Sequence, residues 1–322
     1  MAINPTISEP SISSVDFVKE ETREPLTPGQ LVWRRFRKHH MALIGAVGIM
    51  LLVLFVLIGS ILVPESSANT GDLLVRLLGP GPGHLLGTDS TGRDVFFRII
   101  YGGQISLFIG ILAVTLEVTL GTVIGGVAAY FGGWIDAILM RFTEAMLAIP
   151  SLFLLIVLAK FLGRDIPTFT ILGRTFSGSV FIVILVIGLT SWMFLARIVR
   201  ANVLSLKELD YISASKALGA NNRRIFFNHL IPNTMGPIIV AATLGLANAI
   251  LTEAYVSFLG LGVQPPTATW GNMMDQAQSF ILRGVWWMWV FPCLFIVFTI
   301  LCINLMGDGL RDAFDPRSSR HL

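Results

Sequence analysis

Two carboxylates lie inside long apolar segments of the sequence, where an ionised side chain is costly. Glu117 falls within residues 105–130 and Glu253 within residues 237–258. A charged side chain at the centre of a bilayer costs about 2.5–3.5 kcal/mol on insertion scales, so it is expected to face a partner group or a wet cavity. Two interpretations stay open for each residue: the lining of a polar pathway that could meet an ammonium group, or an internal hydrogen bond.

The other reactive side chains show no catalytic or metal-binding arrangement. Cys293 and Cys302 are nine residues apart, which places them on opposite sides of a helix and makes a disulfide or a metal pair unlikely to form. The sequence has no GxxxxGK[ST] loop that could hold a nucleotide phosphate. We therefore expect no catalytic residue, metal or cofactor in this chain. Four histidines lack ligand spacing: His39, His40, His84 and His229.

Composition indicates that these carboxylates lie in a membrane protein. Of the 322 residues, 54% are hydrophobic and only 13% are charged, and the mean hydropathy is +0.74. Soluble domains carry roughly 25% charged residues. The sequence therefore predicts an all-α membrane protein.

Six apolar segments are long enough to cross a ~30 Å hydrocarbon core as helices. The basic residues before the first segment, residues 41–63, suggest a signal peptide as an alternative to a span. The segment is too long for the apolar region of a signal peptide. The predicted spans are 41–63, 105–130, 143–162, 180–198, 237–258 and 290–306. Residues 163–178 and 259–288 are expected as loops on the side opposite the termini.

The regions outside the spans have distinct compositions. Residues 1–27 are rich in Ser, Pro, Thr and Glu and predict a disordered tail. Thr27 and Pro28 look like an N-cap and a first helical residue. They open a basic amphipathic helix, 28–40, that is expected at the membrane surface. Residues 64–104 form a loop before the core at 105–306, and residues 307–322 form a tail.

Charge sets the expected orientation. With six spans, 16 of the 23 Lys and Arg residues fall on the side that holds both termini. The positive-inside rule places that side in the cytoplasm. Both termini and the loop 197–236 are therefore expected to be cytoplasmic, whereas the loop 64–104 is expected outside.

The loop 197–236 is predicted to form two short helices. Ser205 and Glu208 fit a capping box for the first helix, and Gly219 fits the residue that ends it. Asn221 is expected to cap the second helix and Pro232 to end it. Such a segment is either a simple connection or a surface that docks on another protein.

This loop resembles the EAA loop of binding-protein-dependent ABC importer permeases, in which Glu-Ala-Ala is followed at fixed spacing by Gly and by Ile-x-Leu-Pro. In this chain Ser213-Ala214-Ser215 occupies the triplet, Gly219 the glycine and Pro232 the proline. The acidic residue of the family is replaced by Ser213. An ionic contact made by the glutamate in relatives is therefore not expected here, whereas a docking helix still is.

Four longer strings resemble the second permease subunit of dipeptide and oligopeptide importers. Together they place the resemblance over about residues 28 to 317. They are HLLGTDSTGRDVFFRIIYGGQISL (84–107), AYFGGWIDAILMR (129–141), AYVSFLGLGVQPPTATWGNM (254–273) and NLMGDGLRDAFDP (304–316).

The resemblance implies a six-span importer permease of the type I fold that works by alternating access in the bacterial inner membrane. It implies a homologous permease partner, two ATPase subunits that hold ATP and Mg, an extracytoplasmic peptide-binding protein, and no nucleic acid. Contact with the ATPase is expected from one set of residues: Asp210, Tyr211, Ser213, Ala214, Ser215, Leu218, Gly219, Ala220, Arg223 and Pro232.

The same resemblance gives Glu117 and Glu253 a place beside a peptide pathway. Just before the second span, Asp89, Arg93 and Asp94 are expected to be structural, with Asp94 paired to Arg98 four residues on. Docking of the external binding protein on them is the alternative.

Two other classes of protein remain alternatives. A self-contained secondary transporter or channel would be expected to show an internal inverted repeat, and none is visible. An intramembrane enzyme would need a nucleophile–base or metal pair. The cargo stays open among dipeptides, oligopeptides and related compounds such as glutathione, haem or nickel chelates.

Overall fold

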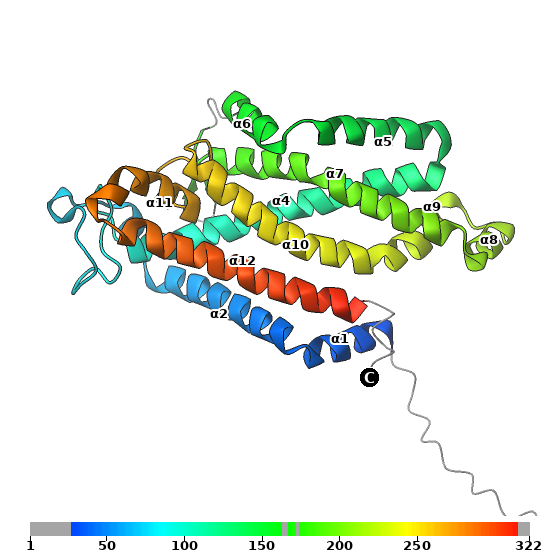
Figure 1. Cartoon of the computed structure of the whole chain (residues 1–322), viewed down its shortest axis with the longest axis horizontal. Coiled ribbons are helices and arrows are strands. Elements are labelled where there is room, and N and C mark those ends of the chain that lie inside the picture. The colour runs from blue at the N-terminus through cyan, green and yellow to red at the C-terminus, as the bar shows by residue number, and fades with distance from the viewer. Residues whose placement is uncertain (1–26, 163–166, 172–173, 315–322) are drawn as a thin grey trace, which may run out of the picture.

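Long helices that lie roughly along a common axis dominate the molecule (Figure 1). The computed structural model describes residues 27–162, 167–171 and 174–314. In this part of the chain, five helices are long and apolar enough to cross a membrane. They are α2 (His40–Leu62), α4 (Val95–Phe131), α7 (Ser179–Lys207), α10 (Ile231–Phe258) and α12 (Trp287–Phe314).

Shorter elements connect these helices. A small antiparallel hairpin, β1 (Phe169–Ile171) and β2 (Arg174–Phe176), lies where the sequence predicted only a loop. The remaining elements are α1 (Pro28–Lys38), α3 (Glu65–Asn69), η1 (Leu73–Val75), α5 (Gly133–Ala148), α6 (Ser151–Leu162), α8 (Asp210–Ala217), α9 (Asn222–Ile225), the π-helical turn η2 (Phe226–Leu230), α11 (Trp270–Ala277) and η3 (Gln278–Arg283).

The predicted third span, 143–162, is not one straight helix. It is divided between α5 and α6, whose axes differ by 90°. The break follows from Pro150, which has no backbone N–H to donate and which disfavours helical geometry at Ile149. Ile149 is extended, with φ −83° and ψ 129°. Counting this bent pair as one span gives up to six spans in the described residues.

Four helices extend well beyond the predicted limits of their spans: α4, α7, α12 and α10, which begins at Ile231 rather than at residue 237. α4 begins at Val95, within the predicted loop 64–104, because Asp94 caps its first turn. α7 continues to Lys207, and α12 continues to Phe314, within the predicted tail. Hydrophobic length fixes where a helix enters lipid, but caps and tertiary contacts fix where it ends. The predicted tail 1–27 lies, apart from Thr27, outside the described residues.

α4 and α7 pack closely because glycines on α4 leave room for the backbone of α7. A Cβ at Gly125 would overlap the carbonyl oxygen of Ala196, and one at Gly121 would lie 2.9 Å from Leu195. Small residues of this kind let two helices approach within a membrane. Gly121 and Gly125 therefore serve a helix–helix contact within this one chain.

The bundle has two distinct ends (Figure 1). One end, called the α8 end here, carries α1, α8, α9 and the last turn of α12. The opposite end, called the α11 end, carries α11 and the segment between α2 and α4. Buried residues such as Ile109, Ile187 and Trp270 fill the space between the long helices.

Candidate functional site

The two short helices at the α8 end form a bracket, which we define as residues 208–230. One buried residue from each part holds it to the bundle: Ile212 in α8, Ile225 in α9 and Leu230 in η2, each 0% exposed. They pack with Leu195 and Val203 of α7 in one apolar cluster. These buried residues fix the inner face of the bracket to the spans.

Gly219 ends α8 as the sequence predicted. Its φ is +81°, a left-handed conformation that favours glycine. The N–H of Gly219 donates to the carbonyl oxygen of Lys216 at 2.9 Å, and that of Ala220 donates to Ser215 at 3.0 Å. These two bonds form the Schellman motif, which satisfies the last carbonyl groups of the helix.

The starts of the helices differ in part from the prediction. Asn221 caps α9, accepting from the N–H of Arg224 at 2.8 Å, as expected. The capping box at Ser205 and Glu208 is wrong, because α7 continues through Ser205 and α8 begins after Leu209, which makes no side-chain cap. Pro232 does not end the second helix. It lies just after the π-helical turn η2, and the helix continues past it through α10 to Phe258.

Side-chain contacts tie the bracket to the end of α4. The Tyr130 hydroxyl donates to Oδ1 of Asn222 at 2.7 Å. Lys207, the last residue of α7, donates from Nζ to the carbonyl oxygen of Tyr130 at 3.0 Å and so ties α7 to the same end of α4. The bracket therefore contacts α4 through this hydrogen bond of Asn222 and α7 through its buried apolar residues.

The outer face of the bracket is open. Leu218 is 88% exposed, which is unusual for a leucine at the tip of a short helix. Two of the proposed contact residues, Ser215 and Ala220, are only half-buried. The others are exposed: Asp210, Tyr211, Ser213, Ala214, Leu218, Gly219, Arg223 and Pro232. Eight of the ten proposed contact residues are therefore exposed in the described chain.

Glu117 lies in a cavity of about 650 Å³ between α4, α7, α10 and α12. It is 14 residues before the end of α4, or about 21 Å along the helix axis. Its carboxylate rests against Gly245, where an added Cβ would lie 3.1 Å from Oε2. The cavity extends from there toward Arg311 near the α8 end. Most of its wall is apolar.

Glu253 has a different environment. It is 0% exposed and does not line the cavity in which Glu117 lies. Ser106 donates to Oε2 at 2.9 Å and Ser257 donates to Oε1 at 2.8 Å. The hydroxyl of Ser106 also accepts from the N–H of Trp270. This arrangement favours a structural link between α4, α10 and α11 over a pathway lining.

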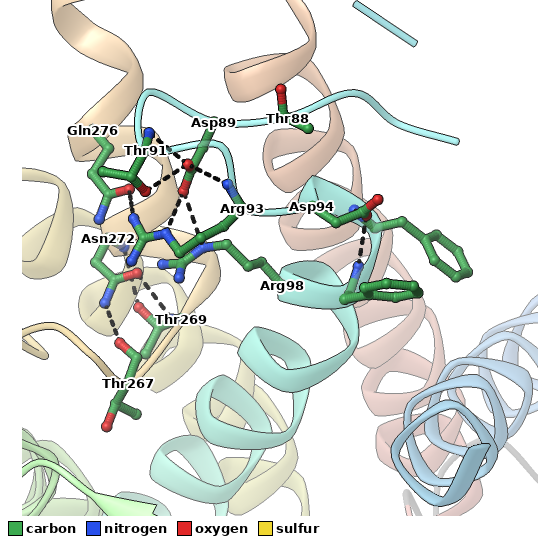
Figure 2. A network of polar contacts seen from close by, with 12 residues as sticks. Thr88, Asp89, Thr91, Arg93, Asp94, Arg98, Thr267, Thr269, Asn272 and Gln276 are labelled. Carbon is green, nitrogen blue, oxygen red and sulfur yellow. Dashed lines mark hydrogen bonds and ion pairs between the residues drawn. The ribbon is translucent and has the colours of Figure 1, made fainter. Parts of the chain in front are cut away.

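Asp89 organises a polar network at the α11 end (Figure 2). Its Oδ1 accepts from Thr91 and from the N–H of Arg93, and its Oδ2 accepts from Nε of Arg93 at 2.7 Å. Arg93 also donates to Gln276 of α11 at 2.9 Å. Burial raises the pKa of Asp89, but the guanidinium groups of Arg93 and Arg98 outweigh it and hold the pKa below the ordinary 3.8.

Arg98 and Asp94 do not form the expected pair. Nε of Arg98 lies 3.7 Å from Asp89, whereas Asp94 caps α4 and contacts His84 at 2.9 Å. Arg98 is 1% exposed, and its three guanidinium nitrogens have no hydrogen-bond partner in the described chain. Most of the charge of this cluster is therefore turned inward, between α4 and α11 (Figure 2).

The structure adds three residues that the sequence analysis did not single out. Asn248 lines the Glu117 cavity from α10, and an amide inside a predicted span was a visible signal. Arg200 of α7 binds Asp136 of α5 through two hydrogen bonds. No short-range sequence signal links these last two residues, because they are 64 positions apart.

Comparison with known proteins agrees with these features. Residues 121–320 match the family model described as binding-protein-dependent transport system inner membrane component, and residues 27–80 match the N-terminal TM domain of oligopeptide transport permease C. A solved structure of the MetNI methionine ABC transporter, in inward-facing conformations, is similar in fold, with a TM-score of 0.52 and 20% identity over 68% of this chain and 97% of that one.

Curated relatives are similar over nearly the whole chain. The dipeptide transport system permease protein DppC of Bacillus subtilis is 41% identical, covering 92% of this chain and 88% of that protein. The oligopeptide transport system permease protein OppC of the same organism is 35% identical, covering 96% of each. The glutathione transport system permease protein GsiD of Pectobacterium atrosepticum is 37% identical, covering 90% and 92%. The chain therefore belongs to the family of binding-protein-dependent transport system inner membrane components, the permease subunits of ABC importers.

Proposed function

We propose that this chain is one of two permease subunits of an ATP-driven importer of dipeptides or oligopeptides. The relatives named for dipeptide, oligopeptide and glutathione transport support a peptide cargo. A homologous permease completes the pathway, and two separate ATPase subunits bind ATP and Mg. A peptide-binding protein outside the membrane delivers the cargo.

One observation carries the coupling mechanism: the bracket is fixed on its inner face and free on its outer face. A rigid element of this kind can seat in a groove of an ATPase subunit. Closure of the two ATPases moves the bracket, and its hydrogen bond to α4 and its apolar packing against α7 pass the movement to the spans. The pathway then alternates between openings on the two sides of the membrane.

Orientation follows from where the basic residues lie. The α8 end carries the basic residues of α1 and the bracket, including Arg35, Arg37, Lys216 and Arg223. The positive-inside rule puts this end in the cytoplasm, with both termini. The α11 end then faces outward. Because Asp89 and Arg93 are held within the Figure 2 network, they position the outer segment, and Asp94 caps α4.

The test is reconstitution of the chain with and without its partners. We expect ATP hydrolysis and dipeptide uptake in liposomes that contain both permeases, both ATPases and the binding protein. The chain alone should do neither. ATP turnover by the purified single chain, or uptake that needs no ATP, would show that the assignment is wrong.

Orientation is tested by cysteine labelling in intact cells. In a variant without native cysteines, Ser215→Cys should resist a reagent that does not cross the membrane. The matched control Gln264→Cys, in the connection from α10 to α11, should react. The reverse pattern would contradict the proposed topology.

A further inference from the structure

The carboxylates of Glu117 and Glu253, both within membrane spans, differ in whether they have hydrogen-bond partners. Both oxygens of Glu253 accept hydrogen bonds from serine hydroxyls. Glu117 is only 9% exposed, yet its carboxylate makes no hydrogen bond or ion pair with any residue in the described ranges. A buried charge without a partner is costly, so a protein keeps one where something else compensates it.

A second unpaired polar group faces the same cavity. Asn248 is exposed and makes no hydrogen bond to the rest of the described chain, although it lies in the middle of an apolar helix. It follows Gly245 by three positions, so both lie on one face of α10. Acyl chains cannot satisfy a carboxylate or an amide. This face therefore borders a polar space rather than lipid.

The cavity has the size of a ligand site. Its volume of about 650 Å³ lies within the range of about 300–1,000 Å³ that small-molecule sites occupy. Apolar residues such as Val240 and Leu244 form most of the wall, and Ser191 and Asn248 add hydrogen-bonding groups. A peptide offers the matching chemistry: amide groups, small side chains and, at a free N-terminus, a cation.

No cation in the described residues forms an ion pair with Glu117. Arg311 lines the same cavity, but no ion pair joins it to Glu117 in the parts of the chain that the structure describes. We propose that Glu117 binds the α-ammonium group of the transported peptide in this cavity, with Asn248 bonding to the peptide backbone. This proposal rests on the proposed function and adds to it a requirement for a free N-terminus.

A cationic side chain of the partner permease is the competing explanation. A single Lys or Arg would neutralise Glu117 but would leave Asn248 and most of the cavity unused. A peptide uses all three features, which is why it is the occupant we propose. The two explanations differ in what happens when peptide is added to the assembled complex.

The experiment measures protection of a cysteine in the cavity, without the binding protein. The complex of both permeases and both ATPases is placed in nanodiscs, with Cys293 and Cys302 replaced and Val240→Cys as reporter. Reaction with a small polar maleimide is timed with alanyl-alanine, with N-acetyl-alanyl-alanine or with neither. The same series is run on Glu117→Gln, on Glu117→Asp and on the control Glu144→Gln, an exposed carboxylate on α5.

We expect alanyl-alanine to slow labelling at least five-fold, whereas the acetylated peptide has little effect. Glu117→Gln should abolish the difference between the two peptides. Glu117→Asp should keep part of it, and Glu144→Gln should keep all of it. Assembly of each variant is checked by co-purification of the four subunits, which distinguishes loss of binding from loss of folding.

Four results would overturn the proposal. Equal protection by both peptides shows that no ammonium group is recognised. Absence of protection in a complex that imports peptide when it is reconstituted in liposomes with the binding protein shows that Glu117 serves another purpose, and leaves the proposed function intact. Loss of the partner permease from Glu117→Gln identifies Glu117 as a contact between subunits. If the wild-type complex imports no peptide at all, the proposed function fails, and this proposal fails with it.

Discussion

The carboxylate of Asp136 in α5 faces the guanidinium of Arg200 in α7 through two hydrogen bonds of 2.6 Å each. This paired geometry matters because α5 buries little else: Thr143 is its one fully buried residue. A stacked contact of Phe142 with Trp192 supports the same interface. The ion pair is therefore a principal link between α5 and α7.

Breaking this link should loosen α5 without unfolding the bundle. We expect Arg200→Lys, which keeps the charge but loses the planar fork, to lower the stability of the complex by about 0.5–1 kcal/mol, since the pair is partly exposed. Asp136→Asn should cost a similar amount. Thermal unfolding in detergent measures both, and the double variant isolates their coupling. Full additivity of the two changes would show that the pair contributes no interaction energy.

Gly219 sets the direction of the chain after α8. A side chain there costs roughly 1–2 kcal/mol because the backbone is left-handed; an added Cβ would touch nothing within 4 Å. Gly219→Val should therefore misplace α9, reducing both ATPase co-purification and uptake. Gly219→Asn is the matched control, because asparagine tolerates this conformation. Normal uptake by the valine variant would mean that the bracket is only a connection.

Ser213 occupies the position at which the family has a glutamate. It is exposed on α8, so a longer side chain there meets no steric obstacle within the chain. We expect Ser213→Glu to preserve folding and to leave ATPase co-purification equal or stronger, if the ATPase groove retains a basic residue. A clear fall in co-purification, with normal membrane insertion, would show that this groove does not accept an acidic residue.

The sequence was sufficient wherever the cause is local. Hydrophobic length located the spans, and the caps at Thr27 and Asn221 and the turn at Gly219 were identified because each depends on residues within three or four positions. Ser205 shows the opposite case: a good local cap signal is overridden because α7 is held against the bundle past that point.

Long-range contacts account for the remaining differences. Nothing in the spacing of Glu117 and Glu253 distinguishes them, because the hydroxyl of Ser106 that satisfies Glu253 comes from another helix, 147 positions away. Arg98 approaches Asp89 rather than Asp94 because the turn after Asp89 folds back over the start of α4 (Figure 2). Pro150 indicates the break before α6, but the apolar residues on both sides of it led to the prediction of a single span, 143–162.

The Asp89 cluster should respond unequally to removal of its charges. Asp89→Asn leaves two guanidinium groups without a buried counter-charge, which is expected to cost about 3–5 kcal/mol. Arg98→Met removes a charge whose nitrogens have no hydrogen-bond partner in the described residues, so it should cost about 1 kcal/mol or less. Thermal unfolding of the assembled complex compares them. A larger loss from Arg98→Met would mean that Arg98 has partners beyond this chain.

The same cluster gives a dependence on acid. Because the pKa of Asp89 is lower in the folded protein than its ordinary 3.8, its contribution to stability is complete above that pH. It is lost as pH falls through the lowered value. Wild-type protein should therefore lose more stability than Asp89→Asn as the pH falls from about 5 to the pH of acid unfolding. This pH window follows from the linkage relation. Parallel acid profiles would show that Asp89 is not held ionised by its neighbours.

Gly245 provides the space in which the Glu117 carboxylate rests, so a methyl group there should separate stability from transport. In Gly245→Ala, the new Cβ would lie 3.1 and 3.2 Å from the two carboxylate oxygens, and the side chain of Glu117 must move by a few tenths of an ångström. The helix itself should gain up to about 1 kcal/mol, because alanine favours helix over glycine. Peptide uptake should nevertheless fall several-fold, and protection of the cavity cysteine by alanyl-alanine should weaken.

Gly29→Ala in α1 is the matched control, since it makes the same exchange with nothing within 4 Å of the added atom and should leave uptake unchanged. Uptake by Gly245→Ala at the wild-type rate, in a complex at least as stable as wild type, would show that the position of the Glu117 carboxylate does not matter for transport.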